Sequence, residues 1–208
     1  MRMQQQGSLT YNAGGASFLR GWPLTLSATI ATATACSFAY TLVGGGLEGW
    51  HSVVRTSAKT SLAFFLAAFV ASSVRALWRT PATAWLLANR RYVGVSFAAS
   101  HAIHLVAILA VVTLSPDFES STTTVIFGGF GYVLLFAMAA TSFDGAVRWM
   151  GRRRWQLLHK TGMYYLWFIF AISYAPRALV ESAWYWLFVL PLLAALALRF
   201  AVYLRQRR

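Results

Sequence analysis

The chain has 208 residues, of which 58% are hydrophobic and 11% are charged, and its formal net charge is +13. A soluble domain carries about a quarter charged residues, so the composition excludes an ordinary soluble enzyme and predicts an integral membrane protein. The basic excess does not indicate a nucleic-acid-binding protein, because the basic residues flank long apolar runs. The single cysteine, Cys36, excludes an intrachain disulfide and a cysteine-ligated cluster.

Six apolar segments predict an all-α membrane protein with a bundle of six transmembrane helices in one domain, residues 23–204. A polar tail, residues 1–22, precedes this domain, and a basic tail, residues 205–208, follows it. Each segment is long enough to cross ~30 Å of hydrocarbon. In chain order the segments are residues 23–45, 60–78, 92–115, 124–142, 157–175 and 183–204.

The links between the segments predict the orientation of the bundle. The links on one side are a polar stretch at residues 46–59, an acidic turn after Pro116, and a break at Pro176 that ends the fifth helix. All lysines and arginines except Arg55, Lys59 and Arg177 fall on the other side. The positive-inside rule therefore predicts that both termini are cytoplasmic, in a multi-pass protein of a bacterial-type inner (plasma) membrane.

Two of the four histidines lie in the middle of the third apolar segment. His101 and His104 are three residues apart, so they share one helical face. An ionisable group in hydrocarbon is costly and by default indicates function. His159 lies at the inner end of the fifth segment, whereas His51 lies in the first link, where we expect an exposed loop histidine.

Three chemistries suit buried neutral histidines. Haem ligation uses imidazoles from facing helices, and a b-type haem needs no cysteine. A proton relay needs an intramembrane carboxylate, and this chain has none away from its helix ends. A zinc site needs three or four ligands; His101, His104 and His159 supply three, without an obvious fourth. Composition therefore favours haem.

Arginines at the inner helix ends are candidates to neutralise haem propionates, although positive-inside anchoring also accounts for them. They are Arg75, Arg79, Arg90 and Arg91.

Several spaced motifs follow one another between residues 55 and 175. They are the segment RTSAKTSLAFFLAAFVASSVR, then Arg90-Arg91-x-x-Gly94 followed by His104, then Thr141-Ser142, Gly151, Trp155, Leu158-His159-Lys160 and Tyr164. In this order they resemble helix two, helix three and the link into helix five of the ferric-reductase-like transmembrane domain family. The resemblance is greatest to the MsrQ-type haem-binding membrane subunits of methionine sulfoxide reductase systems.

The resemblance implies one b-type haem between the third and fifth helices. His104 matches the family's helix-three ligand and His159 its first helix-five ligand, while His101 is an additional candidate. The family's second helix-five histidine falls at Ile172 in this chain. By helical rise, His104 lies ~20 Å past Arg91, and His159 lies ~8 Å into the fifth segment's basic end. The two imidazoles therefore face each other only if the helix ends are staggered by about two turns.

The resemblance also implies a haem-b electron-transfer subunit, hence an oxidoreductase component, that passes electrons from a cytoplasmic or quinone donor to an acceptor outside. No soluble stretch is long enough for a FAD or NAD domain. The expected partners are therefore haem, membrane lipid, a quinone or flavin donor and a periplasmic oxidoreductase subunit, and no nucleic acid. Two alternatives stay open: a haem-less bundle of the same fold that acts as a binding or assembly partner, and a metal or small-solute transporter that uses the histidine cluster.

Overall fold

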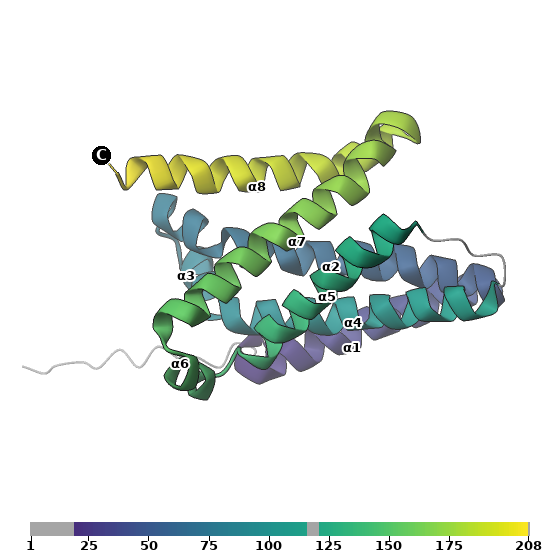
Figure 1. Cartoon of the computed structure of the whole chain (residues 1–208), viewed down its shortest axis with the longest axis horizontal. Helices are drawn as coiled ribbons and strands as arrows, with labels where there is room; N and C mark the ends of the chain where they lie inside the picture. The colour runs from purple at the N-terminus through teal and green to yellow at the C-terminus, as the bar shows by residue number, and fades with distance from the viewer. Residues whose placement is uncertain (1–18, 116–120, 208) are drawn as a thin grey trace, which may run out of the picture.

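The computed structural model describes residues 19–115 and 121–207, and these residues form helices joined by short turns, without a strand (Figure 1). This confirms the all-α class. The elements are α1 (Gly21–Leu42), α2 (Gly46–Leu77), α3 (Pro81–Ala88), α4 (Arg90–Leu114), α5 (Thr122–Ala140), α6 (Asp144–Met150), α7 (Arg152–Val180), a short 3-10 turn (Ala183–Tyr185) and α8 (Trp186–Arg205). The predicted acidic turn after Pro116 lies outside the described residues.

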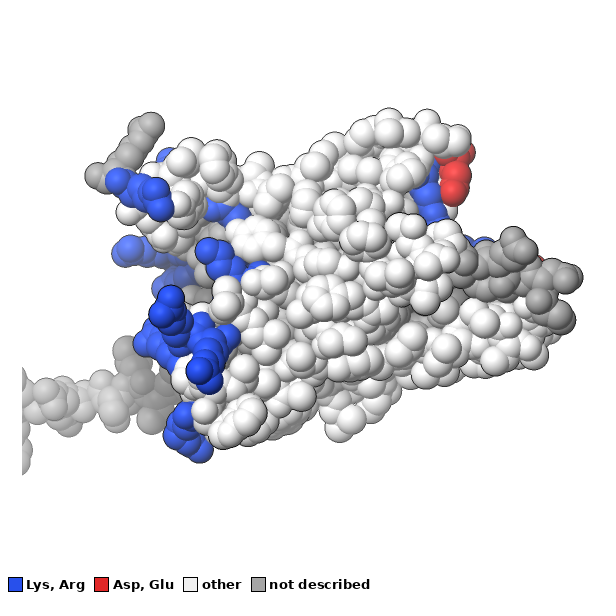
Figure 2. All heavy atoms as spheres, viewed as in Figure 1, with Lys and Arg blue, Asp and Glu red and all other residues white. Residues whose placement is uncertain are grey.

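Five of the described helical segments are long and apolar enough to cross a membrane: α2, α4, α5, α7 and Ala183–Arg205. The chain is therefore a multi-pass membrane protein. Figure 2 shows a broad uncharged belt between a strongly basic end and an opposite end that carries both signs of charge. The sixth predicted span, α1, has 22 residues but is rich in threonine and serine, and it is not among the five. The six-span count and the orientation of the termini stay predictions.

Helix α2 is the centre of the bundle. It packs against α4 and α1 on one side and against α8 on another, while α5 packs on α7 and α7 on α8 (Figure 1). Small buried side chains line the contact between α2 and α4, among them Ser57, Ser61, Ser96 and Ser100. In a membrane, where apolar burial does not distinguish lipid from protein, such small residues stabilise a helix pair by letting the backbones approach closely.

The predicted polar link at residues 46–59 is wrong as a loop, because these residues form roughly the first four turns of α2. The link shrinks to a glycine turn, in which Gly45 has φ 76°, a conformation that side chains with a Cβ rarely adopt. A Cβ on Gly45 would also lie 3.2 Å from the Tyr40 ring. His51 is consequently a half-buried helical residue.

The glycines of this turn do not form a dinucleotide-binding loop. Gly44, Gly46 and Gly49 have the G-x-G-x-x-G spacing of such a loop, but they join two helices, whereas a dinucleotide-binding loop joins a strand to a helix.

The predicted end of the fifth helix at Pro176 is also wrong, because α7 continues to Val180. Proline removes one backbone hydrogen bond but does not end a helix that packing holds on both sides. Here Tyr174 before the proline and Ala178 after it are both buried.

Aromatic side chains fill the space between α2, α4 and α7. Phe65 and Phe69 on α2 are fully buried, Phe97 on α4 meets Phe65 at 5.4 Å between ring centroids, and Phe170 on α7 meets Phe65 at 5.2 Å. Helices α4 and α7 have no extensive backbone contact of their own. The third and fifth predicted segments are thus separated by a layer of rings.

Gly162 of α7 faces the side chain of Met138 on α5. A Cβ at this position would lie 2.6 Å from Sδ of the buried Met138. We expect Gly162→Leu to overpack this contact and to destabilise the protein by about 1–3 kcal/mol, seen as a lower thermal unfolding midpoint in detergent. The matched control is Gly128→Leu on α5, where a Cβ has open space. Equal losses in both variants would contradict this account of the packing.

Candidate functional site

His101 and His104 lie one above the other on α4, with ring centroids 5.0 Å apart and an interplanar angle of 29°. They point toward α2, where each Nδ1 atom meets a serine hydroxyl. The prediction that the two share one helical face is confirmed. Because both imidazoles project from the same side of the same helix, they cannot bind one metal ion from opposite sides.

The backbone of α2 fixes the tautomer of His104. Its Nδ1 atom lies 3.1 Å from the carbonyl oxygen of Val54 and 3.1 Å from Oγ of Ser57. A carbonyl oxygen only accepts, so Nδ1 carries the proton and donates it. The Ser57 hydroxyl donates its own proton to Val53 at 2.6 Å. Nε2 of His104 is therefore unprotonated and has no hydrogen-bond partner among the described residues, which is the arrangement that orients an imidazole as a metal ligand.

His101 is held in a similar way. Its Nδ1 lies 3.0 Å from Oγ of Ser61, and that hydroxyl donates to the carbonyl of Ala58 at 3.0 Å. When the hydroxyl proton is used in this way, Nδ1 of His101 donates to Ser61 and Nε2 is the unprotonated nitrogen. Hydroxyl and carbonyl groups of α2 thereby hold both imidazoles by their Nδ1 atoms.

Aromatic rings enclose His101 on its other sides. Tyr132 of α5 stacks on it at 5.0 Å, and Phe97 and Phe170 lie 5.5 Å and 5.7 Å away. The hydroxyl of Tyr132 is buried and, among the described residues, has no hydrogen-bond partner. A buried hydroxyl without a partner is unusual, and its position beside His101 fits a site that a polar group of a bound molecule completes.

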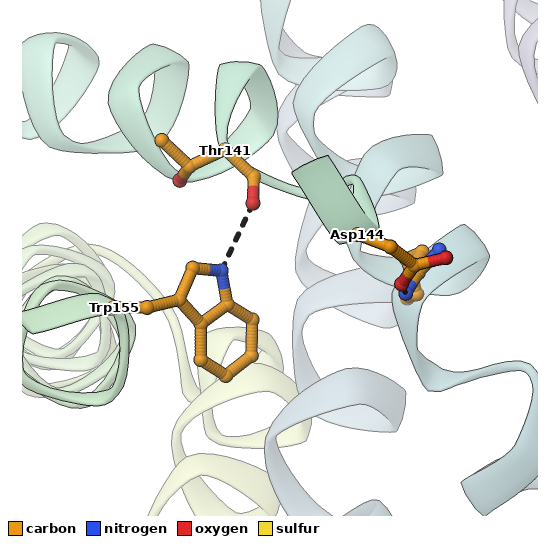
Figure 3. A network of polar contacts seen from close by, with 4 residues as sticks. Thr141, Asp144 and Trp155 are labelled. Atoms are coloured by element: carbon orange, nitrogen blue, oxygen red, sulfur yellow. Dashed lines mark hydrogen bonds and ion pairs between the residues drawn. The ribbon is translucent and has the colours of Figure 1, made fainter. Parts of the chain in front are cut away.

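His159 belongs to a different place in the bundle. Its ring stacks on Trp155 at 4.2 Å, and its Nε2 lies 3.2 Å from Oγ1 of Thr141, whose hydroxyl donates to Ala137. Trp155 in turn donates from Nε1 to the Thr141 carbonyl at 2.9 Å (Figure 3). The nitrogen that usually binds iron is therefore engaged in a hydrogen bond in His159, whereas in His104 it is free.

The two predicted haem ligands are not at the same depth. His159 lies near enough to Arg90, the first residue of α4, for their charges to interact. His104 is fourteen residues further along α4, or ~21 Å by helical rise. The structure thus brings His101 and His104 together and leaves His159 close to the basic end.

Ile172, where the resemblance implies a second helix-five histidine, points away from His101 and His104. Its side chain is 45% exposed and lines a hollow of about 590 Å³ between α5 and α7, together with Thr124 and Ser173. The α7 residue that contacts His101 is Phe170. A helix turns about 100° per residue, so positions 170 and 172 lie on nearly opposite faces.

The four predicted arginines have different environments. Arg75 donates to the carbonyl of Thr80 at 3.2 Å and so fastens the turn before α3. Arg91 forms an ion pair with Asp144 of α6, and the hydrogen bond from Arg91 lowers the pKa of that exposed carboxyl. Arg90 donates to the Ala68 carbonyl at 3.0 Å. Arg79 makes no side-chain hydrogen bond or ion pair within the described residues.

Sequence reasoning missed Arg199, which it treated as one more basic residue of the inner side. Arg199 of α8 donates to the Phe69 carbonyl at 2.6 Å and to Oη of Tyr164 at 3.2 Å. The signal was present in the sequence, because Arg199 lies inside the last apolar segment, six residues before Arg205.

The histidines fit one axial ligand of a haem and do not supply a facing second one. His104 offers a free, oriented Nε2, and the unpaired Tyr132 hydroxyl lies beside its neighbour His101. No imidazole from another helix stands opposite, because Phe170 occupies that side. Within residues 19–115 and 121–207, no three His, Cys, Asp or Glu side chains gather into a metal site, so His101, His104 and His159 do not assemble the tridentate zinc site considered above.

The unpaired hydroxyl of Tyr132 generates a prediction for the ligand-free protein. Removing a buried polar group that lacks a partner relieves a desolvation penalty of about 1–3 kcal/mol, so we expect Tyr132→Phe to raise the thermal unfolding midpoint. The control is Tyr165→Phe on α7, which loses a hydrogen bond of 2.9 Å to the Phe127 carbonyl and should not stabilise. A lower midpoint for Tyr132→Phe would show that the hydroxyl is paired.

Comparisons with known proteins support the predicted resemblance. No protein-family model matches the chain, and no solved structure matches it. The chain is 31% identical over 121 residues to the protein-methionine-sulfoxide reductase heme-binding subunit MsrQ of Polaromonas naphthalenivorans (strain CJ2), a match that covers 55% of this chain and 53% of the relative. The chain thus spans about half the length of the curated relative it matches. Over that stretch it is similar to an MsrQ-type haem-binding membrane subunit, as its motifs predicted.

Proposed function

We propose that this chain is a haem-binding electron-transfer subunit of the membrane, in which His104 would hold the iron of one b-type haem. The observation that carries the proposal is the tautomer of His104, whose Nδ1 proton is fixed by Val54 and whose Nε2 is left free. The similarity to a haem-binding subunit supports the same cofactor. Cys36 is the only cysteine, so a haem attached through a pair of cysteines is excluded and a non-covalent haem is favoured.

When bound, haem supplies a one-electron carrier, and the residues of this chain prepare its environment. Val54 and Ser57 hold the imidazole of His104 by accepting from Nδ1, which also raises its basicity as a ligand. The rings of Phe97 and Phe170 pack against the neighbouring His101 and exclude water from that part of the interior. His101 is a second free imidazole one turn away, and His159 with Arg90 forms a separate polar group nearer the basic end.

The orientation and the partners belong to the same proposal. The basic end lies in the cytoplasm by the positive-inside rule, so α1 is a sixth span and both termini are cytoplasmic, in an inner membrane. Electrons pass from a cytoplasmic flavin-dependent or quinone donor to a periplasmic oxidoreductase subunit, which makes the chain one component of an oxidoreductase. The supporting observations are the asymmetry of charge in Figure 2 and the reductase subunit named in the relative.

A haem-less bundle that acts as an assembly partner is the second candidate, and one observation favours it. Tyr132 and Phe170 already pack against His101 at 5.0 Å and 5.7 Å, where a bound macrocycle needs room. A haem-binding subunit requires these two rings to move aside, whereas a haem-less bundle does not. No comparable observation favours a metal or small-solute transporter.

Absorption spectroscopy of the protein purified after expression with ample haem tests the first candidate. We expect a Soret band and a reduced α-band, and we expect His104→Ala to lower the haem content at least tenfold, because the oriented ligand is lost. His51→Ala, which removes a half-buried histidine one turn before Val54 on α2 that makes no hydrogen bond to His104, is the control and should retain haem. A colourless preparation, or equal haem content in the two variants, would favour the haem-less bundle.

The face of α7 generates a second test, on the haem-loaded protein. With a single imidazole supplied by the chain, the haem-loaded protein should give a high-spin signal in electron paramagnetic resonance. Phe170→His places an imidazole from α7 beside His101, the neighbour of His104, so we expect a shift toward a low-spin signal. Ile172→His adds a histidine at the exposed hollow instead and should leave the spin state unchanged. A low-spin signal in the unsubstituted protein, or a larger change from Ile172→His, contradicts this geometry.

A further inference from the structure

Arg199 is a cation inside a membrane-spanning helix. It lies six residues before the end of α8, or ~9 Å by helical rise. Its guanidinium carbon lies 4.4 Å from the ring centroid of Phe69 and 5.0 Å from that of Tyr164, and it donates hydrogen bonds to both residues. An ionisable side chain at this depth is expensive and indicates a function.

Arg90 approaches the same part of α2 from the other side. Its Nε donates to the carbonyl of Ala68, and Nη1 of Arg199 donates to the carbonyl of the next residue, Phe69. The two guanidinium groups, from α4 and α8, are thus tied to consecutive peptide groups of α2. They are close enough for their positive charges to repel each other.

Neither of these guanidinium groups has a carboxylate partner among the described residues, where the ion pairs are Arg91–Asp144 and Arg177–Glu181. The hydrogen bonds of Arg90 and Arg199 leave both Nη atoms of Arg90 and the Nη2 of Arg199 without a partner in the described part of the chain. Two neighbouring half-buried guanidinium groups repel each other, so a bound anion would stabilise them. The planar guanidinium group donates two parallel hydrogen bonds, which matches a pair of phosphate oxygens.

The surface of α7 beside this pair combines cationic and apolar side chains. A shallow, open hollow of about 540 Å³ runs along this one helix, and Tyr164, which accepts from Arg199, is among its lining residues. Lys160 adds a third cation to the wall, while Leu157 and Phe168 make it apolar. Arg90 begins α4 beside Arg91, and Arg199 lies in the last two turns of α8, which ends at Arg205, so both belong to helix ends that carry further basic residues.

We propose that Arg90 and Arg199, with the hollow along α7, bind the phosphate headgroup of an anionic phospholipid. The two guanidinium forks take the phosphate oxygens, and the hollow takes the start of an acyl chain. Basic pockets between transmembrane helices recognise lipid headgroups in this way. The proposal does not depend on haem, since no histidine lines the hollow.

The test uses the full chain in mild detergent, with thermal unfolding followed during titration with phosphatidylglycerol or with phosphatidylcholine. We expect stabilisation by phosphatidylglycerol only. Arg90→Gln and Arg199→Gln should each weaken the apparent affinity about tenfold, as expected for the loss of a charge-assisted hydrogen-bond pair. Arg153→Gln is the matched control, because Arg153 is exposed at the same end and makes no side-chain hydrogen bond or ion pair within the described residues; it should bind as the unsubstituted chain does.

Two outcomes would overturn the proposal: equal stabilisation by the two lipids, or an equal loss of affinity in the Arg153→Gln control. Inorganic phosphate and glycerol 3-phosphate form a second arm, and stabilisation by either at a similar concentration would assign the site to a soluble phosphate and overturn the lipid source. Arg199 also holds α8 to α2. If Arg199→Gln does not fold, the test uses Arg90→Gln and native mass spectrometry of co-purified lipid. Anionic phospholipid should remain bound to the unsubstituted chain and be depleted in Arg90→Gln, and equal amounts in both would overturn the proposal.

Discussion

The contact between α2 and α4 is the constraint on which the rest of the molecule depends. Ser57, Ser61 and Ser100 are completely buried in it, and a buried hydroxyl is tolerated only when it is hydrogen-bonded. Ser57 and Ser61 meet this requirement with carbonyls of their own helix and then accept from the imidazoles of α4. One set of contacts therefore brings the two helices together and orients both histidines, and the Val54 carbonyl fixes the tautomer of His104.

The side of the histidines that faces away from α2 has aromatic neighbours instead of hydroxyl and carbonyl groups. There the neighbours are aromatic rings from α5 and α7, which offer apolar surface and one unpaired phenol. The site is consequently asymmetric: a hydrogen-bonding wall that orients imidazoles faces an aromatic wall that supplies no ligand. His159 stands outside this arrangement, engaged with Thr141 and close to Arg90. A chain with four histidines thus has one oriented pair and a third imidazole at another depth.

Most of the helical architecture follows from the sequence, because long apolar runs between charged links leave a membrane chain few choices. The spans α4 and α5 begin within two residues of their predicted limits. The errors occurred where local signals competed with packing. Residues 46–59 look like a polar loop, yet they continue α2 because its buried face, with Gly49, Val53 and Ser57, extends through them. Pro176 suggests a helix end, yet the packing of its neighbours carries α7 past it.

The candidate site was only partly predictable for a related reason. The spacing of His101 and His104 placed them on one face, but spacing along one helix does not tell which residue of another helix stands opposite. Only the tertiary structure gives that information. It shows that Phe170, and not Ile172, is the α7 residue in contact with His101. Arg199 was overlooked because a basic residue near a helix end has an ordinary topological explanation. Its contacts with Phe69 and Tyr164, which come from two other helices, were invisible in its own segment.

Arg199 also has a consequence for how the protein is made. An arginine near the middle of a segment raises the cost of inserting that segment by about 2.5–3.5 kcal/mol, and less toward its end. The groups that offset this cost, the Phe69 carbonyl and the Tyr164 hydroxyl, belong to helices that are synthesised earlier. The last span therefore enters the bilayer most favourably when α2 and α7 are already in place to receive its guanidinium. Membrane insertion of α8 is in this way coupled to the assembly of the helices before it.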